Sequence, residues 1–155
     1  MKKSSKILLL VLAVLLALTA IAAAVHLSAR TPDTAGTIRV ERAGEAVTVA
    51  WDELKLVPVQ GQMKTGKGET REIDARGILL RDLIAAAGFD PAGCAGAEVT
   101  AADSYYAQVD AAELMAADKV YIIEQEEGGF RQIVFGDENS KRNISDVVSV
   151  TVLTD

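Results

Sequence analysis

The feature that most constrains this chain is a continuous apolar run near its start. Residues 7–25 carry no charge and consist almost entirely of Leu, Val, Ile and Ala. As a helix, that run would be about 28 Å long, close to the thickness of the hydrocarbon core of a bilayer. We therefore predict that residues 1–27 form a signal anchor whose helix, through residues 7–25, crosses a membrane.

Charges that flank the run predict on which side of the membrane the remainder lies. Lys2, Lys3 and Lys6 precede the run, and basic flanks stay in the cytoplasm, so we expect a single-pass protein of the cell membrane with an extracytoplasmic C-terminal part. The alternative is secretion after signal cleavage, because residues 20–22 and 22–24 fit the small-x-small cleavage pattern. An ordinary signal sequence has a shorter apolar region, of roughly 7–15 residues, which favours the anchor.

The composition of the remaining residues is that of a folded protein. The chain is 50% hydrophobic and 25% charged, which are ordinary values for a globular domain. We expect a polar linker over residues 28–36 and one domain over residues 37–155. Without the four basic residues in or beside the N-terminal segment, the chain has 12 basic and 22 acidic residues, which give a net charge of −10. Such a domain repels phosphate backbones, so nucleic acid is not an expected partner.

The domain lacks side chains on which many catalytic and metal sites depend. Cys94 is the only cysteine, and His26, beside the apolar run, is the only histidine. An internal disulfide, a zinc site of His and Cys ligands, and Ser-His-Asp or Cys-His catalysis are therefore excluded within the domain. We assign no catalytic residue and no metal ligand.

Apolar alternation predicts a mostly β domain of the α+β class with a mixed sheet. Strands are expected over residues 37–41, 46–50, 69–74, 97–101, 105–109, 119–124, 130–135 and 147–153, with a further strand before a turn at residues 64–68. One helix is expected from Ile78 to Ala87, with an apolar stripe that includes Leu79 and Leu83 and with Gly88 as its cap. A shorter helix over residues 111–117 is expected to begin after Asp110.

Several of these segments match a known pattern in their order. Residues 75–88, Ala-Arg-Gly-Ile-Leu-Leu-Arg-Asp-Leu-Ile-Ala-Ala-Ala-Gly, are similar to x-Gly-Val-Pro-Leu-x-Asp-Leu-Leu-x-x-Ala-Gly. Further matching segments are residues 51–54, 98–105, 109–114, 119–124 and 144–153. Together they resemble the sulfite-oxidase-type oxidoreductase molybdopterin-binding domain over most of residues 37–154. The resemblance implies an α+β fold and, in the enzymes of that family, a molybdenum–pterin cofactor.

The chain departs from the family where its enzymes hold the metal. Their molybdenum-ligating cysteine precedes the Gly-Val-Pro-Leu segment, whereas residues 57–63 here read Val-Pro-Val-Gln-Gly-Gln-Met. The family's Val-Lys-Trp stretch near the pterin is replaced by residues 144–146, Ile-Ser-Asp, and its Asp-Gly-Tyr by residues 103–105, Asp-Ser-Tyr. We therefore expect no cofactor and a non-catalytic binding or interaction module. The alternative is a redox accessory or oxidoreductase that still binds a pterin or metal.

The candidate binding residues are Asp103, Tyr105 and Tyr106. Asp103 fits either a general base beside Tyr105 or, as we favour, a residue that initiates a turn. In a strand, neighbouring tyrosines point to opposite faces, so we expect one in the core and the other in a surface groove.

Three other features have two interpretations each. Cys94 is either a reactive thiol or, as we favour, a small side chain tucked under its loop. A group of basic residues fits either an anion site or, as favoured, cross-strand pairs with the acidic residues among them; the group is Lys64, Lys67, Arg71, Arg76 and Arg81. A group of acidic residues fits either a calcium site or solvated turns, which we favour; the group is Glu124, Glu126, Glu127, Asp137 and Glu138.

Overall fold

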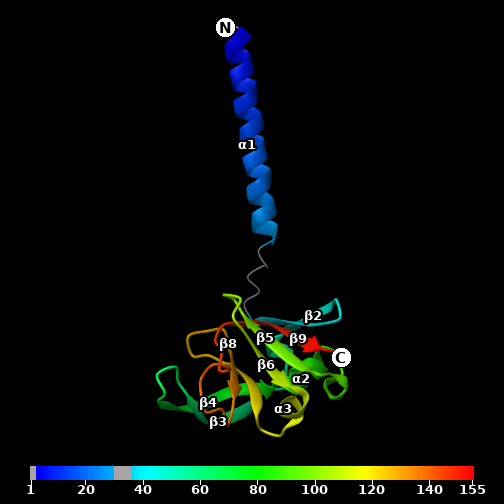
Figure 1. Cartoon of the computed structure of the whole chain (residues 1–155), viewed down its shortest axis with the longest axis vertical. Helices are drawn as coiled ribbons and strands as arrows, with labels where there is room; N and C mark the ends of the chain where they lie inside the picture. The colour runs from blue at the N-terminus through cyan, green and yellow to red at the C-terminus, as the bar shows by residue number, and fades with distance from the viewer. Residues whose placement is uncertain (1–2, 30–35) are drawn as a thin grey trace. The chain divides into compact units, whose positions relative to one another are not determined.

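A computed structural model of the chain describes residues 3–29 and 36–155. The chain divides into two compact units, Met1–Thr34 and Ala35–Asp155. The described residues of the first unit form helix α1 (Lys3–Ala29), drawn in blue in Figure 1. Helix α1 includes residues 28 and 29, which were expected in the linker, and residues 30–35 of that predicted linker lie outside the described residues.

Helix α1 is long and apolar enough over Ser5–Ala22 to cross a membrane. Side chains throughout this window are exposed, and over residues 7–22 all but Thr19 are apolar, as expected of a helix surrounded by lipid. The hydroxyl of Thr19 donates to the carbonyls of Leu15 and Leu16, so the polar side chain is satisfied within the helix. The predicted apolar helix is confirmed, and it suits both a membrane anchor and a signal sequence.

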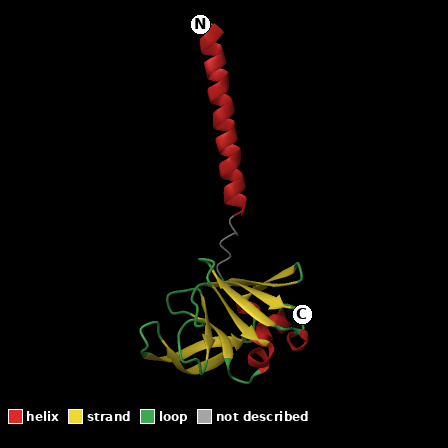
Figure 2. Ribbon diagram, in the orientation of Figure 1, coloured by secondary structure: helices red, strands yellow, loops and turns green. Residues whose placement is uncertain are grey.

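The second unit is an α+β domain built mostly of strands, as predicted (Figure 2). Its strands are β1 (Thr37–Arg42), β2 (Glu45–Ala50), β3 (Val57–Lys64), β4 (Thr70–Leu79), β5 (Gly96–Ala101), β6 (Tyr106–Asp110), β7 (Val120–Glu124), β8 (Phe130–Val134) and β9 (Val147–Leu153). Its helices are α2 (Leu80–Ala86), α3 (Ala111–Met115) and the short 3-10 helices η1 (Trp51–Glu53) and η2 (Pro91–Gly93).

The strands form two sheets instead of the single mixed sheet that we expected. The first has the order β2-β1-β9-β5-β6 and is mixed, because β1 and β9 are parallel while the other neighbours are antiparallel. The second has the order β3-β4-β7-β8 and is antiparallel throughout. The strands predicted over residues 37–41 and 46–50 are confirmed as β1 and β2, and they form an antiparallel hairpin. Ala43 and Gly44 in its turn have φ angles of 48° and 85°, as a tight hairpin turn requires.

The main hydrophobic core lies between the two sheets and α2. Alternate residues of each strand point into it, among them Val40, Val99, Ile122 and Val150, which are all buried. Trp51 is also buried, and the centroid of its ring lies 4.5 Å from that of Phe130.

The helix expected over residues 78–87 begins later than predicted. Strand β4 continues through Leu79, because Gly77–Leu79 pair with β7, and the ladder hydrogen bonds override the local helical pattern. Leu79 therefore does not belong to the helical stripe, whereas Leu83 on α2 is completely buried in the core. Gly88 has a φ of +90° and ends the helix as expected.

Helix α3 has the predicted start and an earlier end. The Asp110 side chain accepts from the Glu113 amide at 2.8 Å, and Glu113 returns a bond to the Asp110 amide, which completes a capping box. The backbone is extended at Ala116 and left-handed at Asp118, so residues 116 and 117 are not helical.

Candidate functional site

The candidate site begins with a sharp corner between β5 and β6. An Asp103 carboxylate oxygen accepts from the Tyr105 amide at 3.0 Å, and the Ser104 amide donates to the Ala101 carbonyl at 3.0 Å. Ser104 has a φ of 70°, a conformation that glycine adopts more easily than serine. Asp103 is thus a turn-initiating residue, as favoured from the sequence.

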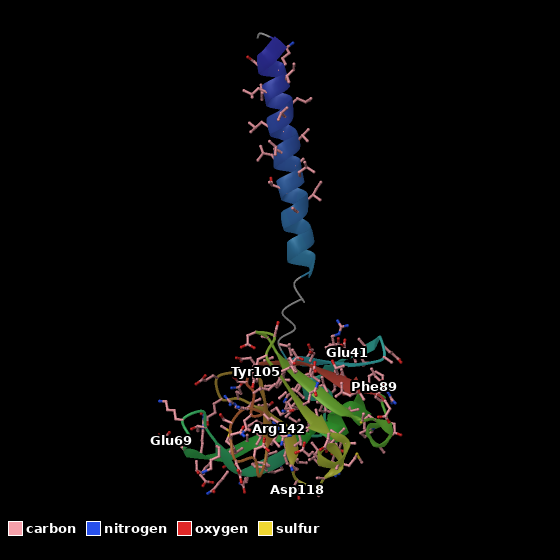
Figure 3. The ribbon with its side chains drawn as sticks, in the orientation of Figure 1. Glu41, Glu69, Phe89, Tyr105, Asp118 and Arg142 are labelled. Atoms are coloured by element: carbon pink, nitrogen blue, oxygen red, sulfur yellow. The ribbon has the colours of Figure 1, made fainter. Side chains whose placement is uncertain are left out.

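A distant segment closes against this corner. The Tyr105 hydroxyl donates to the Lys141 carbonyl at 2.9 Å, and the Ala102 amide donates to the Asp146 carbonyl at 2.9 Å. Figure 3 labels Tyr105 at this place in the domain. Two stretches separated by more than thirty residues, 101–105 and 140–146, therefore face each other.

A cavity of about 470 Å³ lies between these two stretches, and we call it the corner cavity. Asp103 and Tyr105 line it, and the Tyr105 side chain is 49% exposed. The other lining residues are Ala101, Ala102, Ser140, Lys141, Asn143, Ile144, Ser145 and Asp146. Two of the three candidate residues are thus brought together in one concave surface.

Tyr106 does not share this cavity. It is 57% exposed and pairs with Thr100 on the solvent-facing side of the first sheet. The expectation that one tyrosine lies in the core is therefore wrong. Tyr105 belongs to the turn, so strand alternation begins only at Tyr106, and Ala107 and Val109 supply the buried side of β6.

Arg142 connects residues 140–146, which form one wall of the cavity, to helix α3. Its guanidinium donates to both carboxylate oxygens of Glu113 at 2.7 and 2.8 Å and to those of Asp137 at 2.6 and 2.8 Å. Hydrogen bonding to Arg142 lowers the pKa of Glu113 from its ordinary 4.5 to about 2, and the two carboxylates raise the pKa of Arg142. Figure 3 labels Arg142 within this part of the domain.

Asn143 holds residues 140–146 in place through hydrogen bonds of its buried side chain. It is 7% exposed, its side-chain oxygen accepts from the Val134 amide at 2.8 Å, and its amide nitrogen donates to the Lys64 carbonyl at 3.4 Å. Sequence reasoning assigned neither Arg142 nor Asn143 a role at the site. Both act through partners that are distant in sequence, so no local pattern identifies them.

Cys94 is buried, and its thiol donates to the Pro91 carbonyl at 2.9 Å. It does not line the corner cavity. The interpretation of this residue as a small side chain packed under its loop is confirmed.

The basic and acidic groups noted in the sequence do not each form one site. Among the described residues, the cross-strand partners of Glu72 and Asp74 are the side chains of Gln62 and Gln60, so the expected cross-strand ion pairs are not formed. Glu124 accepts from the Trp51 indole, whereas Asp137 binds Arg142 elsewhere in the domain. Within residues 3–29 and 36–155, no group of three or more His, Cys, Asp or Glu side chains is arranged to hold a metal ion.

Comparisons with known proteins return no relative: no protein-family model and no curated protein matches this chain. Two carboxylates, Asp103 and Asp146, and one ammonium, Lys141, give the lining a net charge of −1. With the hydroxyls of Ser140 and Ser145, this lining suits a polar ligand that is neutral, zwitterionic or cationic, and it disfavours an anion.

Proposed function

We propose that this protein is an extracytoplasmic binding module, held at the membrane by α1, that binds a polar ligand in the corner cavity without catalysing a reaction. We further propose that its scaffold is that of the sulfite-oxidase-type molybdopterin-binding domain. The proposed scaffold is supported by the motifs of residues 75–88 and 98–105 and by the order of the strands and helices in which these motifs lie.

The observation that carries the proposal is the convergence of the β5–β6 corner and residues 140–146 on one cavity. The corner is held by its own turn hydrogen bonds, and the opposite wall is held by Arg142 and Asn143. Both walls are thus fixed before any ligand arrives, and a preformed concave site with a few convergent polar groups is the usual form of a ligand site.

Residues in the expected molybdenum region do not fit a molybdenum–pterin group. The family's ligand is a thiolate, whereas β3 presents Gln60 and Gln62, which are paired with Asp74 and Glu72, and Met63, which is buried. The thiol of Cys94 is enclosed elsewhere. The net negative lining of the corner cavity also opposes a pterin phosphate.

We expect protein purified from its native host to contain no stoichiometric molybdenum. Elemental analysis combined with pterin fluorescence measures both parts of the cofactor. Molybdenum at one atom per chain would refute the non-catalytic assignment and favour an oxidoreductase.

Single substitutions of Tyr105 and Tyr106 test the binding site. We expect native mass spectrometry of the full chain to find a bound small molecule on the wild type, and we expect Tyr105→Ala to lose it because the cavity wall is removed. Tyr106→Ala is the matched control, since Tyr106 is similarly exposed, at 57%, and lies outside the cavity. Absence of a bound species on the wild type, or equal retention by both variants, would contradict the assignment.

A further inference from the structure

The second sheet has a smaller apolar cluster on the face that points away from the main core. Its buried members are Val59, Met63, Ile73, Tyr121, Ile123 and Ile133. The sheet curls around this cluster: a Cβ atom placed on Gly61 of edge strand β3 would lie 2.7 Å from the ring of Phe135, which follows the opposite edge strand β8. The two edges therefore approach each other, and the cluster lies in the hollow of the sheet.

One end of this hollow opens into a cavity of about 230 Å³, which we call the arginine cavity. Met63, Ile73 and Ile123 provide apolar walls, and Arg71 and Arg131 lie at the same cavity. It shares none of its lining residues with the corner cavity. The arginine cavity is thus a separate site whose lining combines apolar, basic and acidic residues; the acidic ones are Glu72, Asp74, Glu124, Glu126 and Glu127.

Strand alternation decides which charged groups face the hollow. Arg71 lies two residues from Ile73 on β4, and Arg131 lies two residues from Ile133 on β8, so both guanidiniums are on the same face as the apolar cluster. Glu72, Asp74 and Glu124 also border the cavity, but they belong to the opposite face of their strands. Each of these three is hydrogen-bonded there, to Gln62, Gln60 and Trp51 respectively.

The two guanidiniums have unused donors. Arg131 donates one bond, to the Asn143 carbonyl at 3.2 Å, and among the described residues no carboxylate lies within 4 Å of either arginine. Burial lowers the pKa of Arg131, and the positive charge of Arg71 lowers it further, whereas Asp146 and Glu127 oppose this. Two neighbouring cations, one of them half-buried, form an arrangement that a bound anion stabilises.

We propose that the arginine cavity binds a small organic acid, with its carboxylate between Arg71 and Arg131 and a short apolar tail against Met63, Ile73 and Ile123. A planar carboxylate matches the hydrogen-bonding geometry of guanidinium groups. Glu126 and Glu127 in the adjacent turn balance the charges of the two arginines. The anion is therefore held by direct hydrogen bonds from the guanidiniums and not by the net charge of the lining, and a monoanion is repelled less than phosphate. The volume is below the ~300–1,000 Å³ of drug-sized pockets, so the tail is short.

Methyl NMR on the full chain in lipid nanodiscs tests this directly. The chain has three methionines, Met1, Met63 and Met115, of which Met63 lines the arginine cavity. With ¹³C-methyl methionine labelling, butyrate should shift the Met63 signal saturably and leave Met115 unchanged. Butanol, which has the tail without the charge, acetate, which has almost no tail, and inorganic phosphate should each bind more weakly.

Single substitutions distinguish binding in the arginine cavity from a general attraction of anions to positive charge. Arg71→Gln and Arg131→Gln should each weaken butyrate binding about tenfold, since each removes a charge-assisted hydrogen bond. Arg76→Gln is the matched control, because it removes the same charge from the opposite face of β4 and should leave binding unchanged. The Arg71 side chain makes no hydrogen bond among the described residues, and Arg71→Gln leaves the backbone pairing with β3 in place, so this variant should fold even if the Arg131 variant does not.

Three results would overturn the proposal. The first is a Met63 signal that does not respond saturably to butyrate at millimolar concentrations. The second is a response to butanol as strong as that to butyrate. The third is equal weakening by Arg76→Gln, which would indicate a diffuse effect of charge.

Discussion

Truncation of Leu83 tests the architecture of the domain most directly. Its side chain is 0% exposed, and it extends from α2 into the core between the sheets. Leu83→Ala removes three carbon atoms, worth about 2.4 kcal/mol at ~0.8 kcal/mol each. The cavity left among rigid neighbours adds to this, so we expect a total loss of about 3–4 kcal/mol in the free energy of unfolding. That is a large part of the ~5–15 kcal/mol that stabilises a typical domain.

Urea denaturation of the full chain in lipid vesicles, which contain no other protein, followed by tryptophan fluorescence, measures this loss. Trp51 is the only tryptophan, and it is buried in the same core as Leu83, so its emission reports unfolding of this domain alone. Asp82→Ala on the exposed side of α2 is the control and should cost less than about 1 kcal/mol. A loss below about 1 kcal/mol for Leu83→Ala would show that α2 does not pack against the sheets.

Three further predictions concern pH, backbone packing and the leader. The folded-state pKa of Glu113 is about 2, below its ordinary 4.5, so its pairing with Arg142 stabilises the fold above about pH 5 and is lost as the pH falls toward 2; the urea midpoints of wild type and Glu113→Gln should differ at pH 7 and converge at low pH. Gly77→Ala should cost about 1–3 kcal/mol, because a Cβ there overlaps the carbonyl oxygen of Ile122, whereas Gly66→Ala meets nothing closer than 3.7 Å and should be tolerated. The intact mass of the membrane-bound protein should include residues 1–27. A mass that corresponds to a chain starting after residue 22 or 24, together with release of the protein from membranes by salt, would show that the leader is cleaved.

Most of the secondary structure was predictable because its signals are local. Gly44, Gly88 and Asp110 mark a hairpin, a helix end and a helix start through their own backbone preferences and side-chain bonds. The prediction was wrong at Leu79, where helical spacing continued into a stretch that pairs with β7. Hydrogen bonds to a strand more than forty residues away decided that conformation, and periodicity does not report them.

The candidate site was predictable only in part. Asp103 and Tyr105 were identified from a short turn motif, and they do line the corner cavity. Tyr106 was included because strand alternation predicted that one of the two tyrosines lines a groove and the other lies in the core; it is exposed on another surface. Arg142 and Asn143, which hold the opposite wall, act through long-range contacts with Glu113 and Val134.

The sequence by itself determined the apolar N-terminal helix, the α+β class and the acidic character of the domain, because each depends on composition or on the period of apolar residues along a short stretch. The tertiary structure alone decided that the strands divide between two sheets and that Arg71 and Arg131 share one cavity. Arg71 and Arg131 are sixty residues apart in the chain, and only the curl of β3, β4, β7 and β8 brings them together. Such proximity results from strand pairing over long sequence distances, which is selected by the packing of the whole core and not by any local preference.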